Sequence, residues 1–261
     1  MQLSHRLQGS RYELKYVISE QRAHAIRDHL LRHLVPDEHA IHLPDHAYSV
    51  RSLYLDSEDL ALCKATLNGE RNRFKLRIRA YDVSSTSPAY FEIKRRVDGA
   101  IEKDRAAVPR SAIQRLVAGQ APRASDLWPE EDQSGLRVLH RFNQLQHAVA
   151  ARARLHVAYR RAAYVVPKGN EVRVTFDRDL TGMPFTGGFD TVDGPPFAVP
   201  TGGVILELKF TDQFPGWLRR MVQMFALNRC SVAKYVRCAT EVSRLHRGHR
   251  RRHAFSLARA V

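Results

Sequence analysis

The sequence contains few cysteines, and they are not arranged as a site. Cys63, Cys230 and Cys238 form neither a CxxC pair nor an even set that disulfides could join. Disulfide frameworks are typical of oxidising compartments, whereas isolated thiols suit a reducing one. The cysteines therefore predict a cytoplasmic protein in which they are ordinary half-buried side chains.

Long apolar runs are absent as well. No segment approaches the roughly 18 apolar residues that a membrane-spanning helix needs. The first residues, MQLSHRLQGSRYELKY, contain no apolar signal-peptide core. We therefore expect no transmembrane segment and no export.

The sequence also lacks the motifs of common nucleotide-binding and hydrolytic enzymes. It contains no GxxxxGK[ST], GxGxxG, HExxH or GxSxG. His39, His42 and His46 would have metal-ligand spacing only on a helix, and Pro44 interrupts that segment. These absences disfavour those enzyme classes and a zinc site.

Acidic residues are scarce relative to basic ones. The chain has 42 Lys and Arg against 27 Asp and Glu, a net charge of +15. From Arg244 onward there are six arginines and no acid, so residues 1–243 retain +9. The charge predicts a polyanionic partner for a main domain over residues 1–243. Residues 244–261 are expected to be a solvated basic tail that could also contact an anionic membrane, nucleic acid or polyphosphate.

Period-two alternation, typical of strands, recurs along the chain, and helical periodicity separates some of these segments. The segments do not follow a regular strand–helix–strand order, which disfavours a doubly wound parallel sheet. The fold class expected is α+β, an eight-stranded antiparallel barrel flanked by helices. Strands are predicted over residues 11–18, 48–56, 72–81, 89–97, 101–108, 152–165, 171–178 and 203–210, and helices over 19–34, 57–67, 110–117, 135–148, 215–227 and 231–246.

The alternating strands are unusual because one face carries mostly cations. Between Arg73 and Arg79, four cations alternate with three apolar residues. Like charges on neighbouring strands repel, and enclosing them is costly unless they meet water or a polyanion. The pattern predicts either a basic barrel interior that binds a polyanion or an exposed basic sheet. The cations on these faces are Arg11, Lys15, Arg73, Lys75, Arg77, Arg79, Lys94, Arg96, Arg161, Arg173 and Lys209.

A few acids share the same faces, among them Glu13, Glu92 and Glu207. Hard oxygen ligands and phosphate oxygens commonly share Mg²⁺ or Mn²⁺, so these three are candidate metal ligands. Each could instead be an internal salt-bridge partner. Glu207 is the strongest metal candidate because Leu206 and Leu208 direct its side chain to the charged face.

Eight short motifs resemble, in order, those of the VTC (vacuolar transporter chaperone) polyphosphate polymerase domain, over roughly residues 10–240. That family belongs to the triphosphate tunnel metalloenzymes, in which eight antiparallel strands surround a basic tunnel. The motifs are RYELKY from Arg11, SLYLD from Ser52, KLRIR from Lys75, FEIK from Phe91, YRRAAY from Tyr159, RVTFDRDL from Arg173, LELK from Leu206 and KY at Lys234.

The resemblance implies a polymerase that transfers the terminal phosphate of ATP to a growing polyphosphate chain, with Mn²⁺ or Mg²⁺ as cofactor. It implies Glu207 as the metal-binding acid and no catalytic Ser, Cys or His. The implied partners are ATP and inorganic polyphosphate. The implied phosphate-binding cations are Lys15, Arg77, Arg79, Lys94, Arg161, Arg173 and Lys234, and the alternation adds Lys75 and Lys209.

Two departures from the family pattern bear on activity. Hydrolytic relatives usually carry ExExK on the first strand, and Arg11 replaces the first glutamate here. That replacement favours the polymerase over a triphosphatase or a cyclase-like enzyme. Ala233 stands where the family often has serine, so ligation around Lys234 differs. The chain resembles the compact bacterial form, without regulatory or membrane domains.

Two alternatives remain open at this point. A non-catalytic polyanion-binding module needs no metal-binding carboxylate, so Glu207 separates it from an enzyme. Specific nucleic-acid binding is not expected, because the aromatic residues alternate onto the apolar faces. A triphosphate or polyphosphate hydrolase would use the same fold and geometry.

Overall fold

Eight long strands form one curled antiparallel sheet in the computed structural model, which describes residues 11–81, 87–98, 100–167, 169, 171–190 and 194–257. Their order across the sheet is β1-β10-β8-β7-β3-β4-β5-β6. Two short strands, β2 (Val35–Pro36) and β9 (Phe197–Ala198), pair with β7 and β8. The long strands are β1 (Arg11–Ile18), β3 (Ala47–Asp56), β4 (Arg73–Ala80), β5 (Ala89–Val97), β6 (Ala100–Val108), β7 (Arg152–Val165), β8 (Val172–Pro184) and β10 (Val204–Thr211).

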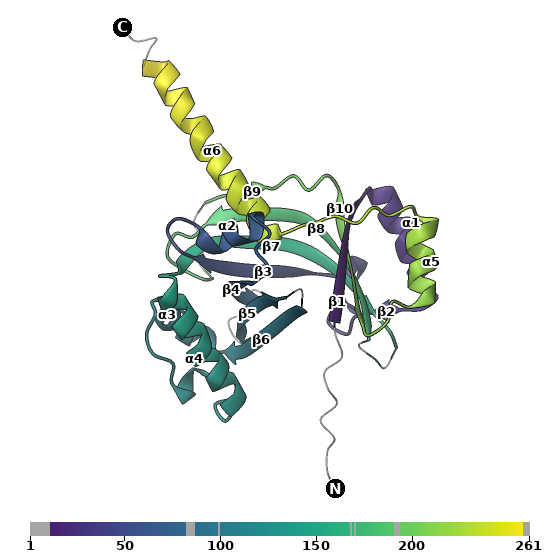
Figure 1. Ribbon diagram of the computed structural model, residues 1–261, viewed down its shortest axis with the longest axis horizontal. Coiled ribbons are helices and arrows are strands. Elements are labelled where there is room, and N and C mark those ends of the chain that lie inside the picture. Colours follow the sequence, from purple (N-terminus) through teal and green to yellow (C-terminus); the bar gives the residue numbers. More distant parts are fainter. Residues whose placement is uncertain are drawn as a thin grey trace.

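The sheet bends into a half-barrel whose edge strands, β1 and β6, turn toward each other (Figure 1). No backbone ladder joins these edges among the described residues. A side-chain contact spans the seam instead, because Lys94 Nζ on β5 lies 3.2 Å from Glu13 Oε2 on β1. The predicted α+β class and its eight antiparallel strands are confirmed.

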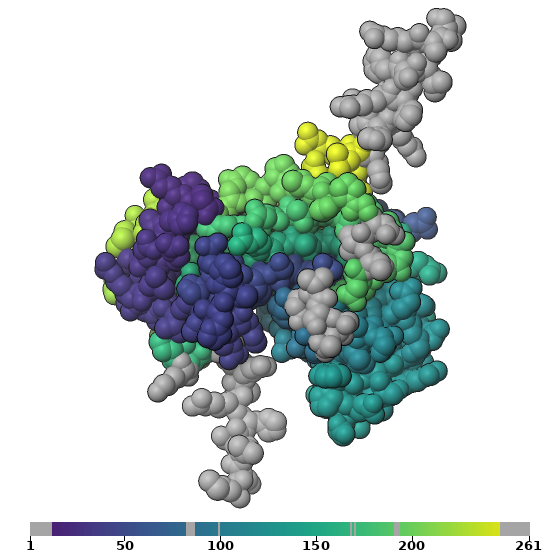
Figure 2. All heavy atoms as spheres, turned by 180° about the vertical axis from the view of Figure 1, so that it is seen from behind, coloured from purple at the N-terminus to yellow at the C-terminus, as the bar shows by residue number. Residues whose placement is uncertain are grey.

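Helices cover the outer, apolar face of the sheet in three groups. Helices α3 and α4 pack on β4, β5 and β6, while α1 and α5 pack on β1, β8 and β10. Helices α2 and α6 pack on β3 and β7. Figure 2, seen from behind, places the N-terminal elements and the α3–α4 layer on opposite sides of the molecule. The helices are α1 (Glu20–Leu30), α2 (Ala61–Leu67), α3 (Arg110–Val117), α4 (Gln133–Ala148), α5 (Gly216–Met224) and α6 (Lys234–Leu257).

The alternation of the strands explains this layering. On β4, Leu76 and Ile78 are fully buried beneath α3 and α4, whereas the intervening cations face the concave side. Helix α1 begins where the Ser19 side chain accepts a hydrogen bond from the Arg22 N–H, and it buries Ala23, Ile26 and Leu30. Burial of apolar side chains stabilises the fold from outside the sheet and leaves its inner face to charged groups.

Element boundaries differ from the prediction mainly at strand and helix ends. Helix α1 ends at Leu30 rather than residue 34, and β8 continues to Pro184. Helix α6 begins at Lys234 and runs to Leu257, so the expected boundary at residue 243 falls inside it. Residues 258–261 of the predicted tail lie outside the described residues. None of the described helices is both long and apolar enough to cross a membrane.

Candidate functional site

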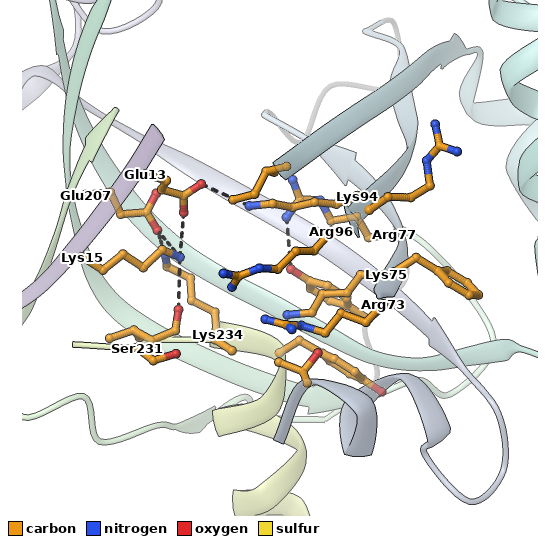
Figure 3. Close-up of a pocket in the computed structure, with 18 of the residues that line it drawn as sticks. Glu13, Lys15, Arg73, Lys75, Arg77, Lys94, Arg96, Glu207, Ser231 and Lys234 are labelled. Atoms are coloured by element: carbon orange, nitrogen blue, oxygen red, sulfur yellow. Dashed lines mark hydrogen bonds and ion pairs between the residues drawn. The ribbon is translucent and has the colours of Figure 1, made fainter. Parts of the chain in front are cut away.

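The charged faces of the strands meet at a pocket of about 500 Å³ on the concave side of the half-barrel. Side chains from β4 and β5 face those from β1, β10 and the start of α6 across it (Figure 3). Residues 229–235, which lead into α6, form a further wall. The predicted site residues that line the pocket are Glu13, Lys15, Lys75, Arg77, Arg79, Lys94, Arg161, Glu207, Lys209 and Lys234.

Strand register places opposite charges side by side within this array. Lys15 on β1 is directly opposite Glu207 on β10. Across β4 and β5, Arg77 is opposite Glu92. Opposite charges on neighbouring strands stabilise the sheet, so the acids predicted on the charged faces are ion-pair partners in the structure.

Glu207 is the centre of the densest cluster. Its carboxylate lies 2.8 Å from Lys234 Nζ and 3.1 Å from Lys15 Nζ. Lys209 Nζ is 3.2 Å away and Arg161 Nη2 is 3.4 Å away. Burial raises the pKa of Glu207, but these positive charges lower it more, so the pKa ends well below its ordinary value. Glu207 is therefore an ionised carboxylate at the pocket wall.

Glu13 is the second carboxylate on this wall. Glu13 Oε1 lies 2.9 Å from Lys15 Nζ, and Glu13 Oε2 lies 3.2 Å from Lys94 Nζ. Burial raises the pKa of Glu13, and the charges of Lys94, Lys15 and Lys209 lower it below its usual range. Because Lys15 contacts both Glu13 and Glu207, the two carboxylates flank one ammonium group.

A second cluster lies along β4. Arg77 Nε donates to Glu92 Oε2 at 2.6 Å, and Arg77 Nη1 donates to the Tyr54 hydroxyl at 3.2 Å. Arg79 donates to Ser52 and to the Tyr159 hydroxyl. These contacts fix the two guanidinium groups before any ligand binds.

Glu92 has a different position from the other two predicted metal ligands. It is fully buried behind Arg77 and is not among the residues that line the pocket. Burial raises its pKa, but Arg77, Arg79 and Lys103 lower it to about 2. Its Oε1 has no hydrogen-bond partner, and Lys103 Nζ is 3.8 Å away. The surroundings of Glu92 therefore suit an ion-pair partner of Arg77 better than a metal ligand.

Arg173 also lies apart from the pocket lining. Its guanidinium is 2.5 Å from Asp37 Oδ2 and donates to the Tyr48 hydroxyl at 3.1 Å. Within the described part of the chain, the structure thus groups the other predicted phosphate-binding cations around one cavity and places Arg173 beside it.

Asp177 on β8 was not predicted as a site residue, yet it holds two of them. Arg161 Nε and Nη2 each donate to its carboxylate at 2.7 Å, and Lys234 Nζ lies 2.6 Å from Asp177 Oδ2. Asp177 is buried and does not line the pocket. Its position opposite Arg161 depends on the register of β8 against β7, which the pattern of a single strand does not reveal.

The expectation that aromatic residues occupy only the apolar faces is wrong for three tyrosines. Tyr54, Tyr159 and Tyr235 line the pocket, with Tyr54 and Tyr235 stacked at 4.6 Å between ring centroids. The Tyr159 ring lies 4.7 Å from Lys234 Nζ. The register of β7 against β8 shifts between Ala158 and Arg160, which explains why the side chain of Tyr159 does not follow simple alternation.

Other pocket residues were missed because their neighbours in space come from distant segments. The lining also includes Arg73, Arg95, Arg96, Arg229 and Cys230. Arg73 and Arg96 were recognised as charged-face cations but not as site residues. Arg229 and Cys230 belong to the segment before α6, where Cys230 N–H donates to the Lys15 carbonyl and Arg229 bridges to Tyr16.

The donor set fits a divalent cation that phosphate oxygens help to bind. Among the described residues no group of three or more His, Cys, Asp or Glu side chains could enclose a metal. Mg²⁺ is usually held by one or two carboxylates together with water and substrate phosphates. Glu207, with Glu13 across Lys15, supplies that kind of partial ligand set, whereas Glu92 is turned toward Arg77.

Comparison with solved structures finds relatives of low sequence identity. A candidate adenylate cyclase from Bacillus halodurans is 12% identical, with 86% of this chain and 94% of that chain covered and a TM-score of 0.45. The PH1819 protein from Pyrococcus horikoshii OT3 is 11% identical, with 88% of this chain and 98% of that chain covered and a TM-score of 0.44. HpAC1 from Hippeastrum, an adenylyl cyclase candidate with a dominant triphosphatase activity, is 15% identical, with 89% of this chain and 96% of that chain covered and a TM-score of 0.49. These TM-scores are too low to indicate an activity for this chain.

Comparison with protein families is decisive where the other comparisons are not. No curated protein matches the chain. The family model of the VTC domain, in contrast, matches residues 10–242, which include every strand of the half-barrel and every predicted site residue. The chain therefore belongs to the VTC domain family.

Proposed function

We propose that this chain is a metal-dependent polyphosphate polymerase that transfers the terminal phosphate of ATP to an inorganic polyphosphate chain. The observation that carries the proposal is the pocket wall itself, where a ring of cations surrounds the ionised Glu207. Phosphoryl transfer depends on positioning and charge neutralisation rather than on a protein nucleophile. Membership of the VTC domain family supports the same reaction class.

The geometry of the pocket residues suggests different roles for the arginines, the lysines and the glutamates. Arg77, Arg79 and Arg161 are held by neighbouring side chains, so their guanidinium forks can bind phosphate oxygens without losing much side-chain freedom. Lys15, Lys94, Lys209 and Lys234 add positive charge at the same wall. Glu207, with Glu13, would hold Mn²⁺ or Mg²⁺. When bound, the ion would neutralise phosphate charge that the cations leave uncompensated.

The transfer itself needs only groups already present in the two substrates. A terminal oxygen of the polyphosphate attacks the γ-phosphorus of ATP, a new P–O–P bond forms, and the bond to the β-phosphate oxygen breaks to release ADP. The pocket residues orient the two chains in line and screen their mutual repulsion. Water in place of the chain terminus would give hydrolysis in the same geometry.

The test is to incubate the full chain with ATP and Mn²⁺ and to follow ³¹P signals. Internal chain phosphates together with ADP are the expected result. Orthophosphate and ADP without internal chain phosphates would show a hydrolase, and binding of polyphosphate without turnover would show a binding module. Glu207→Gln and Arg77→Ala should each remove the chain signal while far-ultraviolet circular dichroism stays unchanged. Full synthesis by Arg77→Ala would contradict its assigned role.

A further inference from the structure

The pocket continues into a second hollow at one end of the half-barrel. That hollow, of about 540 Å³, shares Thr66, Arg73, Arg96 and Ser231 with the first pocket. Arg71 and Asp98 lie at its outer side. A continuous path therefore leads from Glu207 past Arg73 and Arg96 to the surface.

The charge balance changes along this path. Near Glu207, the cations described above each contact a carboxylate. At the outlet, no described acid forms an ion pair with Arg73 or Arg96, which we call the outlet cations. The Arg73 guanidinium donates to the carbonyl oxygen of Glu70, a backbone contact. Asp98, the acid of the hollow, is occupied by Arg71 at 2.9 Å.

Strand register places the outlet cations among like charges that repel one another. Arg73 is directly opposite Arg96, and Lys75 is directly opposite Lys94, on the same face of β4 and β5. Like charges in cross-strand pairs destabilise a sheet. Burial lowers the pKa of Lys75 to about 8, with Lys94, Lys15 and Arg77 acting in the same direction and Tyr54 opposing them. An anion is the ligand that would relieve this repulsion.

The chemistry of the hollow narrows the kind of anion. Its wall consists of Thr66, Leu67, Gly69, Arg71, Arg73, Arg96, Asp98 and Ser231, with no aromatic ring among them. Single-stranded nucleic acids depend on base stacking against aromatic side chains. The wall therefore suits a polyanion without bases, whose repeating phosphates alone contact the arginines.

We infer that the outlet cations form a subsite for the phosphates of a linear polyphosphate beyond those held around Glu207. This inference rests on the proposed function. It adds that the phosphates incorporated earlier into the polyphosphate leave the half-barrel between β4, β5 and α2. The subsite increases affinity for long chains and leaves the affinity for three phosphates unchanged.

The test measures binding, not turnover. The full chain is titrated calorimetrically with tripolyphosphate and with long-chain inorganic polyphosphate. We expect the long chain to bind at least about tenfold more tightly, and Arg73→Gln/Arg96→Gln to remove most of that difference. The same variant should bind tripolyphosphate within about twofold of the unsubstituted chain.

The matched control removes two arginines from the outer face of the sheet. Arg160 and Arg178 are opposite one another on β7 and β8 and pair with acids outside the pocket. Arg160→Gln/Arg178→Gln changes the net charge equally and should retain the preference for long chains. Arg73→Lys/Arg96→Lys, which keeps both positive charges, should retain more of the preference for long chains than Arg73→Gln/Arg96→Gln does.

Two results would overturn the inference. The first is that the unsubstituted chain binds long-chain polyphosphate and tripolyphosphate with equal affinity. The second is that Arg73→Gln/Arg96→Gln prefers the long chain as strongly as Arg160→Gln/Arg178→Gln does. Failure of the proposed function is a separate result, because a chain that hydrolyses ATP or leaves it intact can still show or lack this preference for length.

Discussion

Asp177 shows how a residue outside the pocket can determine what the pocket does. Its carboxylate and that of Glu207 share the same two cations, Arg161 and Lys234. A ligand that draws Glu207 away leaves Arg161 and Lys234 still attached to Asp177. We therefore regard Asp177 as a positioning residue that keeps these cations in place when Glu207 changes partners.

For Asp177→Asn we predict a separation of binding from turnover. Removing a negative charge leaves the pocket more positive, so tripolyphosphate should bind at least as tightly as before. Glu207 then becomes the remaining carboxylate partner of two buried cations, and chain synthesis should fall by about tenfold or more. Calorimetry and ³¹P detection of product measure the two effects. An equal loss of both would show a general loss of structure instead.

Lys75 is the pocket lysine with the clearest reason to titrate near neutrality. Burial is the main cause of its lowered pKa of about 8, and neighbouring cations add to it. A bound polyphosphate stabilises the charged ammonium and raises that pKa, so binding is favoured below pH 8 and is coupled to proton uptake above it. Tyr54 faces Lys75, and Arg77, Arg79 and Lys75 lower its pKa to about 8 against the effect of burial.

The predicted outcome is a loss of tripolyphosphate affinity between pH 7 and 9, reaching about tenfold for a single group with this pKa. Lys75→Arg stays charged and should lose less affinity than the unsubstituted chain over the same range. Titration of the ligand is common to both proteins, so the difference isolates Lys75. Tyr54→Phe measures the contribution of the phenol separately, and identical pH profiles for all three would contradict the assignment.

At the scale of elements, Asp56 joins three parts of the fold. Its buried carboxylate, at the end of β3, accepts hydrogen bonds from the Leu62 and Cys63 N–H groups at the start of α2. It also accepts one from the Tyr235 hydroxyl in the first turn of α6 at 2.7 Å. Tyr235 follows Lys234 directly, so Asp56 also fixes where α6 presents that lysine.

Asp56→Asn should therefore destabilise the fold by about 2–3 kcal/mol, because an amide cannot replace every acceptor site and places an N–H₂ group among donors. Urea unfolding followed by tryptophan fluorescence measures the change. Asp59→Asn, an exposed change in the same turn, should leave the midpoint almost unchanged. Similar midpoints for both variants would show that the Asp56 contacts contribute little to stability.

Most elements were predictable because each long strand carries its own periodic signal. Residues 11–18, 89–97 and 152–165 were predicted with the bounds that the structure has. The short strands β2 and β9 escaped notice because two-residue bridges depend on their partners, β7 and β8, rather than on local pattern. The far end of β8 was missed for a similar reason, since its pairing with β7 resumes beyond a register shift.

The charge of the whole molecule should govern how strongly it holds any polyanion. A net charge of +15 and a pocket lined mainly by Lys and Arg imply that binding releases counterions and weakens with salt. Between about 50 and 200 mM salt we expect the affinity for long-chain polyphosphate to fall by at least about tenfold. Calorimetry across this range tests it, and an affinity independent of salt would contradict electrostatic recognition.

The site as a whole was only partly predictable for a physical reason. Alternation identified the inner cations because a single strand determines which face a side chain occupies. It could not show which carboxylate pairs with which cation, as in Glu92 behind Arg77 and Asp177 behind Arg161, because those pairs depend on the register between strands. Apart from Lys234, residues 229–235 were missed as a wall because they reach the pocket through tertiary packing.

The unjoined seam between β1 and β6 leaves β6 as an edge strand whose outer backbone groups pair with no strand of the described chain. Such edges recruit other strands and promote aggregation unless charge discourages approach. Glu102, Lys103, Asp104 and Arg105 occupy the middle of β6 in succession, so both faces of its edge carry charge. The half-barrel is thereby protected against edge-to-edge assembly at high protein concentration.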